Sequence, residues 1–223
     1  MEPLTIHPRT DDRDISSIPP IAHEHGNNNA PKQDSFIVEV FKFSILALII
    51  VVPFRMFIAQ PFIVSGASMA PTFATGEYLI VDQITYRFEP PKRGDVVIFR
   101  YPNDPSKFYI KRIIGLPGEV VELSNGNTVI VDPATDARVT LDEPYLKRDR
   151  TDDHDSTTLS SNEYYVMGDN RGASSDSREW GTVPRDNIVG RAFIRLLPPG
   201  QLSFMPGHCT YNNLLASSCS TTN

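Results

Sequence analysis

The chain has 223 residues, a formal net charge of −6 and a hydrophobic fraction of 40%. This length allows one sizeable domain with accessory segments, and the hydrophobic fraction allows that domain to bury a core. The acidic balance gives no basis for nucleic acid as a partner, because phosphate binding requires a basic surface.

Residues 1–35 are rich in Pro, Asn, Asp and His and show little hydrophobic periodicity. Such a segment buries too little apolar surface to offset the entropy lost on ordering. We therefore predict a disordered N-terminal tail over 1–35.

Residues 36–59 are strongly apolar, although the uninterrupted centre from Phe43 to Phe54 is shorter than the roughly 20 residues that a bilayer requires. Lys42 and Arg55 can extend their amines and guanidines toward the headgroups and so lengthen the span. A buried helix of a soluble domain is the alternative. Because a polar tail precedes this segment and β-like sequence follows it, we predict a transmembrane anchor over 36–59.

Residues 60–206 contain short apolar or alternating runs that are typical of β-strands. These runs are Tyr78–Val81, Asp95–Phe99, Phe108–Ile114, Glu119–Leu123, Glu163–Met167 and Ile188–Leu197. A turn signal at 124–127 predicts a hairpin over 119–131. Helical periodicity is weak, so we predict a mainly β domain with an antiparallel sheet.

Two further segments are polar. Residues 132–162 are rich in Asp and predict a polar insert, and residues 207–223 predict a disordered C-terminal tail. The chain's two cysteines, Cys209 and Cys219, lie in that tail and lack metal-site spacing. A disulfide between them and two free thiols both remain open.

Histidine is the usual base for a serine or cysteine nucleophile, and the chain has five histidines. None lies in a dense motif of the β region; they are His7, His23, His25, His154 and His208. This argues against a Ser-His-Asp arrangement. No His, Asp or Glu cluster has ligand spacing, so we expect no metal and no cofactor.

Ser68 lies among small residues just after the apolar segment, and Pro71 fixes the turn that follows. A turn of this kind exposes a hydroxyl, although a purely structural turn explains the same pattern. Lys111 shares one face of a predicted strand with Tyr109 and Ile113. Burial there would disfavour the ammonium form and allow the neutral amine to act as a base. A surface lysine on a strand edge is the alternative.

Four motifs together resemble the type I signal peptidase family, the bacterial leader peptidases that use a Ser–Lys pair. The motifs lie between about 61 and 199 and are Ser68-Met69 with Pro71-Thr72, Arg93-Gly94-Asp95-Val96-Val97, Tyr109-Ile110-Lys111-Arg112 with Gly115-Leu116-Pro117-Gly118, and Gly168-Asp169-Asn170-Arg171 with Ser174, Asp176-Ser177-Arg178 and Trp180-Gly181.

The resemblance implies a role for each matching residue. Ser68 would be the nucleophile, Lys111 the general base and Ser174 the hydroxyl that orients the lysine. Asp176 and Arg178 match a structural ion pair, and Asp169 is expected to face Arg112. Some family members carry a serine two residues before the nucleophile as a second oxyanion donor; here that position is Gly66, which leaves the second donor open.

The resemblance also implies the substrate and the location. A signal peptide of an exported preprotein would bind as an added strand, with small residues in two pockets. The matching positions are Phe62, Val64, Met69, Tyr109 and Ile110. The lipid bilayer would be the second partner, with the catalytic domain on the extracytoplasmic side of the plasma membrane or its equivalent.

Two other functions are alternatives to a signal peptidase. Self-cleaving repressor peptidases use the same Ser–Lys chemistry but are soluble and bind DNA, which the apolar segment and the acidic charge oppose. The alternative from another class is a catalytically silent, membrane-tethered module that binds extended peptides. The presence of Ser68, Lys111 and Ser174 together favours the enzyme.

Overall fold

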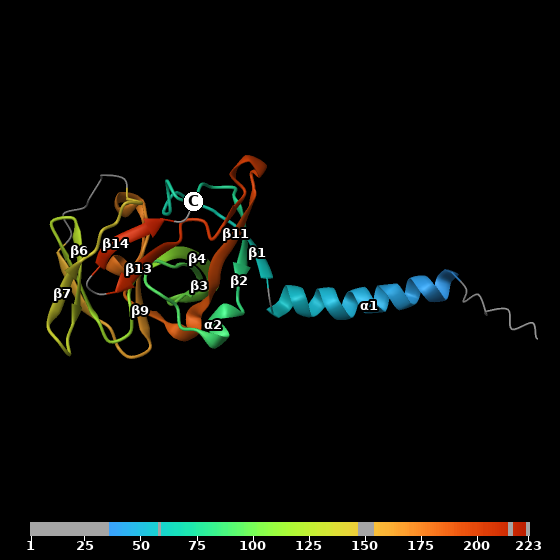
Figure 1. Cartoon of the computed structure of the whole chain (residues 1–223), viewed down its shortest axis with the longest axis horizontal. Helices are drawn as coiled ribbons and strands as arrows, with labels where there is room; N and C mark the ends of the chain where they lie inside the picture. The colour runs from blue at the N-terminus through green and yellow to red at the C-terminus, as the bar shows by residue number, and fades with distance from the viewer. Residues whose placement is uncertain (1–35, 58, 147–153, 214–215, 222–223) are drawn as a thin grey trace, which may run out of the picture. The chain divides into compact units, whose positions relative to one another are not determined.

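The computed structural model describes residues 36–57, 59–146, 154–213 and 216–221 (Figure 1). The tail predicted over 1–35 lies outside these residues. The apolar segment that follows forms the helix α1, Phe36–Phe57. Within the described part of the chain, no helix combines the length and the apolar character needed to cross a membrane. The anchor over 36–59 stays a prediction.

The largest element is an antiparallel sheet of eight strands in the order β1-β2-β11-β3-β4-β9-β10, with β12 paired to β11. Its strands are β1 (Ala59–Ile63), β2 (Tyr78–Asp82), β3 (Val96–Tyr101), β4 (Asp104–Gly115), β9 (Glu163–Met167), β10 (Val183–Pro184), β11 (Ile188–Leu197) and β12 (Ser203–Phe204). The expectation of a mainly antiparallel β domain is confirmed. Because β1 ends this sheet, one edge of β1 is left for another strand to pair with.

A second antiparallel sheet has the order β7-β6-β5-β8. Its strands are β5 (Val120–Ser124), β6 (Asn127–Asp132), β7 (Ala137–Thr140) and β8 (Asp155–Thr158). Asn125 and Gly126 connect β5 to β6 with φ angles of 50° and 71°. Positive φ at both central residues is what a two-residue hairpin turn of the right twist requires, so the predicted hairpin is confirmed.

Short helices lie between the strands. They are α2 (Thr85–Phe88), α3 (Ser177–Trp180), η1 (Arg171–Ala173), η2 (Arg185–Asn187) and η3 (Pro199–Gln201). Asp176 caps α3, because its side chain accepts a hydrogen bond from the Arg178 N–H. The cap fixes the start of this helix close to the loop that carries Ser174.

The segment predicted as a polar insert is part of the fold. It supplies β7 and β8, which flank the β5–β6 hairpin on its two sides. Leu141 and Leu159 from this segment are 7% and 3% exposed and belong to the same core cluster as Ile130 and Tyr165. The sequence is polar because the side chains of β7 and β8 are all exposed or only partly buried, and the leucine that follows each strand attaches the segment to the core.

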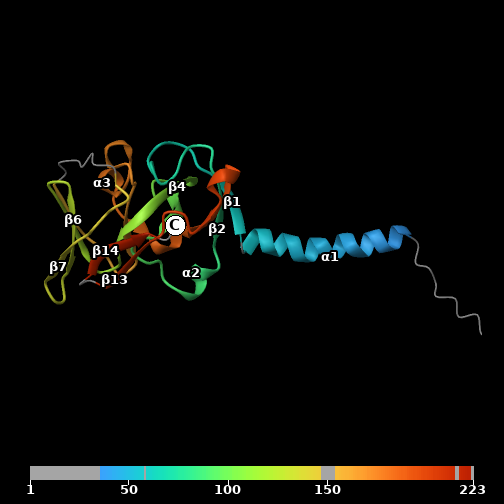
Figure 2. The ribbon, with the colours of Figure 1, turned by 45° about the horizontal axis from the view of Figure 1, so that its top comes forward.

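The described part of 207–223 also differs from the prediction of a disordered tail. β13 (Cys209–Asn213) and β14 (Ala216–Thr221) form a two-stranded sheet. Both views of the ribbon place this hairpin between the second sheet and the region of β4 (Figures 1 and 2). Cys209 is buried and disulfide-bonded, and Cys219 is the only other cysteine in the chain. A covalent closure lowers the entropy cost of ordering a polar segment, which composition alone does not reveal.

A core substitution tests whether the 132–162 segment belongs to the domain. Leu159→Ala should lower the free energy of unfolding by about 2–5 kcal/mol, because it opens a cavity in a packed cluster. Chemical denaturation of the purified chain measures the difference.

The neighbouring exposed Thr158 supplies the control. Thr158→Ala should change stability by about 0.5 kcal/mol or less. Equal effects of the two substitutions would contradict a structural role for this segment.

Candidate active site

Ser68 lies on the loop that joins β1 to β2. Backbone hydrogen bonds close the base of this loop, from the Val64 N–H to the Glu77 carbonyl and from the Gly76 N–H to the Val64 carbonyl, both 2.9 Å. On the other side, the Asn170 N–H donates to the Ser68 carbonyl over 2.9 Å. The serine is therefore held by its own hairpin and by the loop that follows β9.

Lys111 reaches Ser68 from β4. Its Nζ lies 2.8 Å from Ser68 Oγ and also donates to the Ile110 carbonyl over 3.1 Å. The lysine is only 4% exposed, and its Nζ lies 5.5 Å from the centre of the Tyr109 ring. Ser68 and Lys111 are 43 positions apart in the sequence, so the fold alone brings the hydroxyl and the amine together.

Burial changes the protonation of this amine. Desolvation lowers the pKa of Lys111 from 10.5 to about 8, against the opposing effect of the negative charges of Asp176 and Asp169. A lysine with this pKa is partly neutral near physiological pH and can accept a proton from a hydroxyl.

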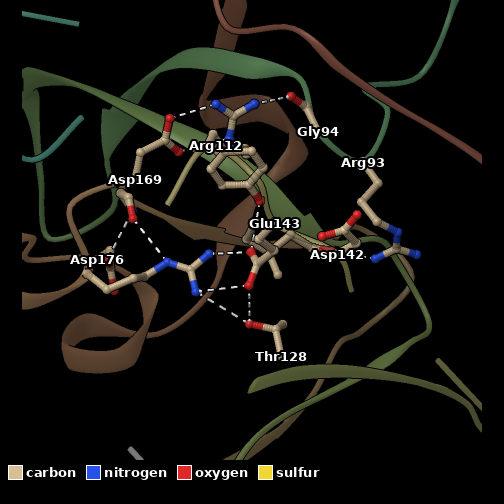
Figure 3. A network of polar contacts seen from close by, with 12 residues as sticks. Arg93, Gly94, Arg112, Thr128, Asp142, Glu143, Asp169 and Asp176 are labelled. Carbon is tan, nitrogen blue, oxygen red and sulfur yellow. Dashed lines mark hydrogen bonds and ion pairs between the residues drawn. The ribbon is translucent and has the colours of Figure 1, made fainter. Parts of the chain in front are cut away.

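Arg112, the next residue on β4, forms a buried ion pair with Asp169 (Figure 3). Its Nε and Nη2 donate to the two carboxylate oxygens of Asp169 over 2.8 and 2.6 Å. Asp169 also accepts a hydrogen bond from the Thr72 hydroxyl, which lies on the same loop as Ser68. One carboxylate thus connects β4 to the loop that carries Ser68.

Ser174 is 9% exposed, and its hydroxyl has no hydrogen-bond partner among the residues that the structure describes. A Cβ added to Gly168 would lie 2.2 Å from Ser174 Oγ and 2.4 Å from the Ser68 carbonyl oxygen. Only glycine at 168 therefore leaves room for both the Ser174 side chain and the Ser68 carbonyl beside it.

Asp176 and Arg178 hold the Ser174 loop in shape. Arg178 Nε lies 2.8 Å from an Asp176 oxygen, and its Nη2 donates to the carbonyls of Arg171 and Ser174. The other Asp176 oxygen accepts from the Gly168 N–H over 3.0 Å. The pair expected from the sequence is thus in contact and ties both sides of the loop together.

A second buried arginine was not singled out by the sequence. Arg171 pairs with Glu143, which also accepts from the Thr128 hydroxyl over 3.0 Å (Figure 3). Glu143 lies in the polar segment 132–162, so its composition gave no reason to connect it to a motif 28 residues away. The Gly-Asp-Asn-Arg motif was the available signal for Arg171.

A cavity of about 300 Å³ opens beside Ser68 and Lys111. Four of the five predicted substrate-binding residues line it: Phe62, Val64, Tyr109 and Ile110. Met69 differs, because its side chain is 1% exposed and packs in the core with Phe73 and Leu79. Met69 is therefore not among the residues that line the cavity.

The cavity lies between two strand edges. One is β1 with the residues that follow it, at the end of the main sheet. The other is the first part of β4, which pairs with β3, whereas β9 pairs with β4 only from Arg112 to Gly115. Both edges are therefore without a second neighbouring strand in the described part of the chain.

Gly66 has a φ of 93°, and its N–H donates to the Thr75 hydroxyl over 3.1 Å. The same hydroxyl donates back to the Gly66 carbonyl over 3.0 Å. The Gly66 N–H is engaged in this contact and is not a free donor toward the cavity.

Comparisons with known proteins place these features in a family. The model of the signal peptidase family, peptidase S26, matches residues 37–197. Signal peptidase I of Leptolyngbya laminosa is 36% identical over 180 residues, which cover 77% of this chain and 85% of that protein. Probable signal peptidase I-1 of Synechocystis is 33% identical, with 83% and 98% covered. Signal peptidase I P of Bacillus subtilis subsp. natto is 35% identical, with 71% and 88% covered. The resemblance inferred from the four motifs is confirmed, and the chain belongs to the signal peptidase family, peptidase S26.

Proposed function

We propose that this chain is a membrane-bound endopeptidase that removes signal peptides from exported preproteins, with Ser68 as nucleophile and Lys111 as general base. The observation that carries the proposal is the 2.8 Å contact between a buried lysine amine and the Ser68 hydroxyl in a member of the signal peptidase family. No other pair of side chains is needed to generate the nucleophile.

The proposed reaction begins when the neutral Lys111 amine accepts the Ser68 proton and Ser68 Oγ attacks the scissile carbonyl. The C–N bond then breaks, and the Lys111 ammonium returns its proton to the leaving amine, which leaves an acyl-enzyme ester. Lys111 next takes a proton from water, and the resulting hydroxide attacks the ester carbonyl. The bond between the acyl carbon and Ser68 Oγ then breaks, Ser68 Oγ takes the proton back from the Lys111 ammonium, and the signal peptide leaves with a free carboxyl group.

The oxyanion formed in each attack needs a hydrogen-bond donor. We assign the Ser68 backbone N–H as the first donor, because it lies next to the attacking oxygen. The Gly66 N–H does not serve while it donates to Thr75. Ser65 is exposed and lines the cavity.

Ser174 is proposed to orient Lys111 during proton transfer. A buried hydroxyl without a partner is unfavourable by roughly 1–3 kcal/mol, so a group that approaches it gains that energy. Donation from the lysine amine in its protonated form would provide this contact and would draw Nζ away from the ester oxygen.

The substrate is proposed to bind as an extended strand between β1 and the first part of β4. Strand addition at two unpaired edges gives affinity through backbone hydrogen bonds and leaves alternate side chains to enter pockets. Phe62 and Phe108 both line this cavity and contact each other in a tilted arrangement, with ring centres 5.4 Å apart. Their bulk, with Ile110 beside them, favours small residues in the substrate.

Membrane attachment is proposed to have two parts. The first is α1, whose described side chains are mostly apolar and exposed. The second is an apolar patch at one end of the main sheet. There Tyr78 of β2 pairs with Ile63 of β1 on one side and with Leu197 of β11 on the other. Leu202 and Phe204, which are 60% and 66% exposed, extend the patch. Contact with the outer face of the membrane would bring the cavity to the end of the signal peptide's apolar segment.

Removal of either proposed catalytic group should abolish cleavage. Ser68→Ala and Lys111→Ala should each reduce kcat by about 10³-fold or more on a preprotein, without loss of folded protein. Electrophoresis of the cleaved product measures the rate.

Lys107→Ala is the control, because Lys107 lies on the same strand but is exposed and paired with Asp104. It should cleave at the wild-type rate. A wild-type chain that binds preprotein but never cleaves it would instead support the silent binding module.

The reaction should also depend on pH in one direction. Because the neutral amine is the base, kcat/KM should rise with pH and reach half its maximum near the Lys111 pKa of about 8. At pH 7 about a tenth of the enzyme would then be competent. A profile on a soluble peptide measures this, and a rate that is constant from pH 6 to 9 would be inconsistent with a lysine base.

The apolar patch should affect cleavage of a membrane-inserted substrate but not of a soluble one. Replacement of Leu202 and Phe204 by serine should slow cleavage of a membrane-inserted preprotein several-fold, but leave a soluble peptide unaffected. Phe88→Ser is the matched control, since Phe88 is 83% exposed but follows the opposite end of β2. Equal effects of the patch and the control substitutions on both substrates would argue against a membrane-facing patch.

A further inference from the structure

Residues Met205–Tyr211, which we call the C-terminal segment, pack behind the active site. The Gly207 carbonyl accepts a hydrogen bond from Arg112 Nη1 over 2.5 Å. The same Nη1 donates to the Gly94 carbonyl over 2.9 Å (Figure 3). With Asp169 bound to Nε and Nη2, each of the three guanidinium nitrogens of Arg112 has an acceptor.

This enclosure is complete. Arg112 is 0% exposed, and the ring of Tyr145 covers the guanidinium face at 3.7 Å. A buried guanidinium is stable only where its N–H groups find acceptors, because water cannot replace them. The Gly207 carbonyl is therefore a necessary part of the enclosure and not an incidental contact.

Three residues of the C-terminal segment make further contacts that hold it in this position. The Tyr211 hydroxyl donates to the Asp142 carbonyl over 3.1 Å and lies 3.4 Å from the Tyr145 hydroxyl. His208 Nδ1 lies 3.2 Å from a carboxylate oxygen of Asp95. A Cβ on Gly94 would lie 2.0 Å from the Cys209 carbonyl oxygen, so the two backbones are in direct contact.

The enclosure bears on the proposed chemistry through Asp169. Asp169 binds Arg112, the neighbour of Lys111 on β4, and the Thr72 hydroxyl of the nucleophile loop. The next residue, Asn170, donates its N–H to the Ser68 carbonyl. A displacement of Arg112 would therefore move both sides of the 2.8 Å contact between the lysine amine and the serine hydroxyl.

From these contacts we infer that the C-terminal segment is a positioning element for proton transfer between Ser68 and Lys111, and that it acts by holding Arg112 against Asp169. The inference rests on the proposed function, because it assumes that Lys111 is the base. It assigns a role in the reaction to residues beyond 197, where the match to the family ends.

The pKa of Lys111 depends on the charges around it. The carboxylates of Asp176 and Asp169 both raise this pKa. Asp176 is paired with Arg178 and Asp169 with Arg112, and the Tyr109 ring is a further neighbour of the amine. If Arg112 moves away, the Asp169 charge is compensated less and stabilises the ammonium more. The pH at which activity is half maximal should then rise.

Gly207→Ala tests the inference in the full chain in detergent micelles. The added Cβ would lie 2.3 Å from Thr72 Cγ2 and 3.5 Å from Arg112 Nη2, at a φ of 69° that disfavours alanine. We expect kcat on a preprotein to fall about tenfold or more with little change in KM. The half-maximal pH should rise by about half a unit.

Gly200→Ala is the matched control, since nothing lies within 4 Å of the added Cβ at this neighbouring glycine. It should retain the wild-type kcat and pH profile. Thermal unfolding of all variants shows that equal amounts of folded protein are compared.

Tyr211→Phe gives a second, milder test, which decides alone if Gly207→Ala does not fold. It removes the hydroxyl contacts to Asp142 and Tyr145 and leaves the nucleophile loop untouched. We expect a loss in kcat of about two- to fivefold, with the same upward shift of the profile.

Folded variants with the wild-type kcat and profile would overturn the inference. A loss of activity without a shift in the profile would overturn it too, because it would show a merely structural role. Failure of the proposed function is distinguishable, since the wild-type chain would then not cleave the preprotein or Ser68→Ala would still cleave it.

Discussion

The contact between Lys111 and Ser68 depends on removing a lysine amine from water without trapping it as a buried cation. Burial alone would favour the neutral amine, but two carboxylates, Asp169 and Asp176, lie close enough to oppose that effect. Each is paired with an arginine, which stays protonated in proteins under all ordinary conditions. The arginines therefore compensate the carboxylates permanently, and the lysine is left as the group that can lose its proton.

The same ion pairs also fix the geometry of the site. A buried ion pair contributes little net stability, because desolvation offsets most of the attraction. Its geometric effect is larger, because two parallel hydrogen bonds fix the angle between a guanidinium and a carboxylate. Asp169 uses this fixed geometry to connect β4, the nucleophile loop and the loop after β9, which are distant in the sequence. The Ser68 hydroxyl and the Lys111 amine are thus positioned by residues to which the proposed reaction gives no chemical step.

Sequence reasoning reached the local features of this arrangement. Alternation located most strands of the main sheet, and the Asn125–Gly126 turn located the β5–β6 hairpin. Elimination of the histidines left Lys111 as a base, and the motifs supplied its partner. What the sequence did not reveal depends on contacts between distant polar residues: the Arg171–Glu143 pair, the attachment of the polar strands β7 and β8, and the contact of Gly207 with Arg112. From their composition, such segments are predicted to be polar and loosely held. The reason is that a hydrophobic pattern reports the burial of apolar groups, whereas hydrogen bonds between buried polar groups leave no such pattern. Met69, predicted to bind substrate, packs in the core cluster against which the cavity residues Phe62 and Ile110 lie, and its role stays a prediction.

A direct titration of the Lys111 amine tests the central claim, that this lysine is the neutral base of the site. The chain can be labelled with carbon-13 at the lysine Cε, and Lys111→Arg identifies the signal of this residue. The signal should titrate with a pKa of about 8, well below that of the exposed lysines. A pKa near the ordinary lysine value of 10.5 would contradict the account, because the amine would then be protonated at every pH at which the enzyme is expected to work.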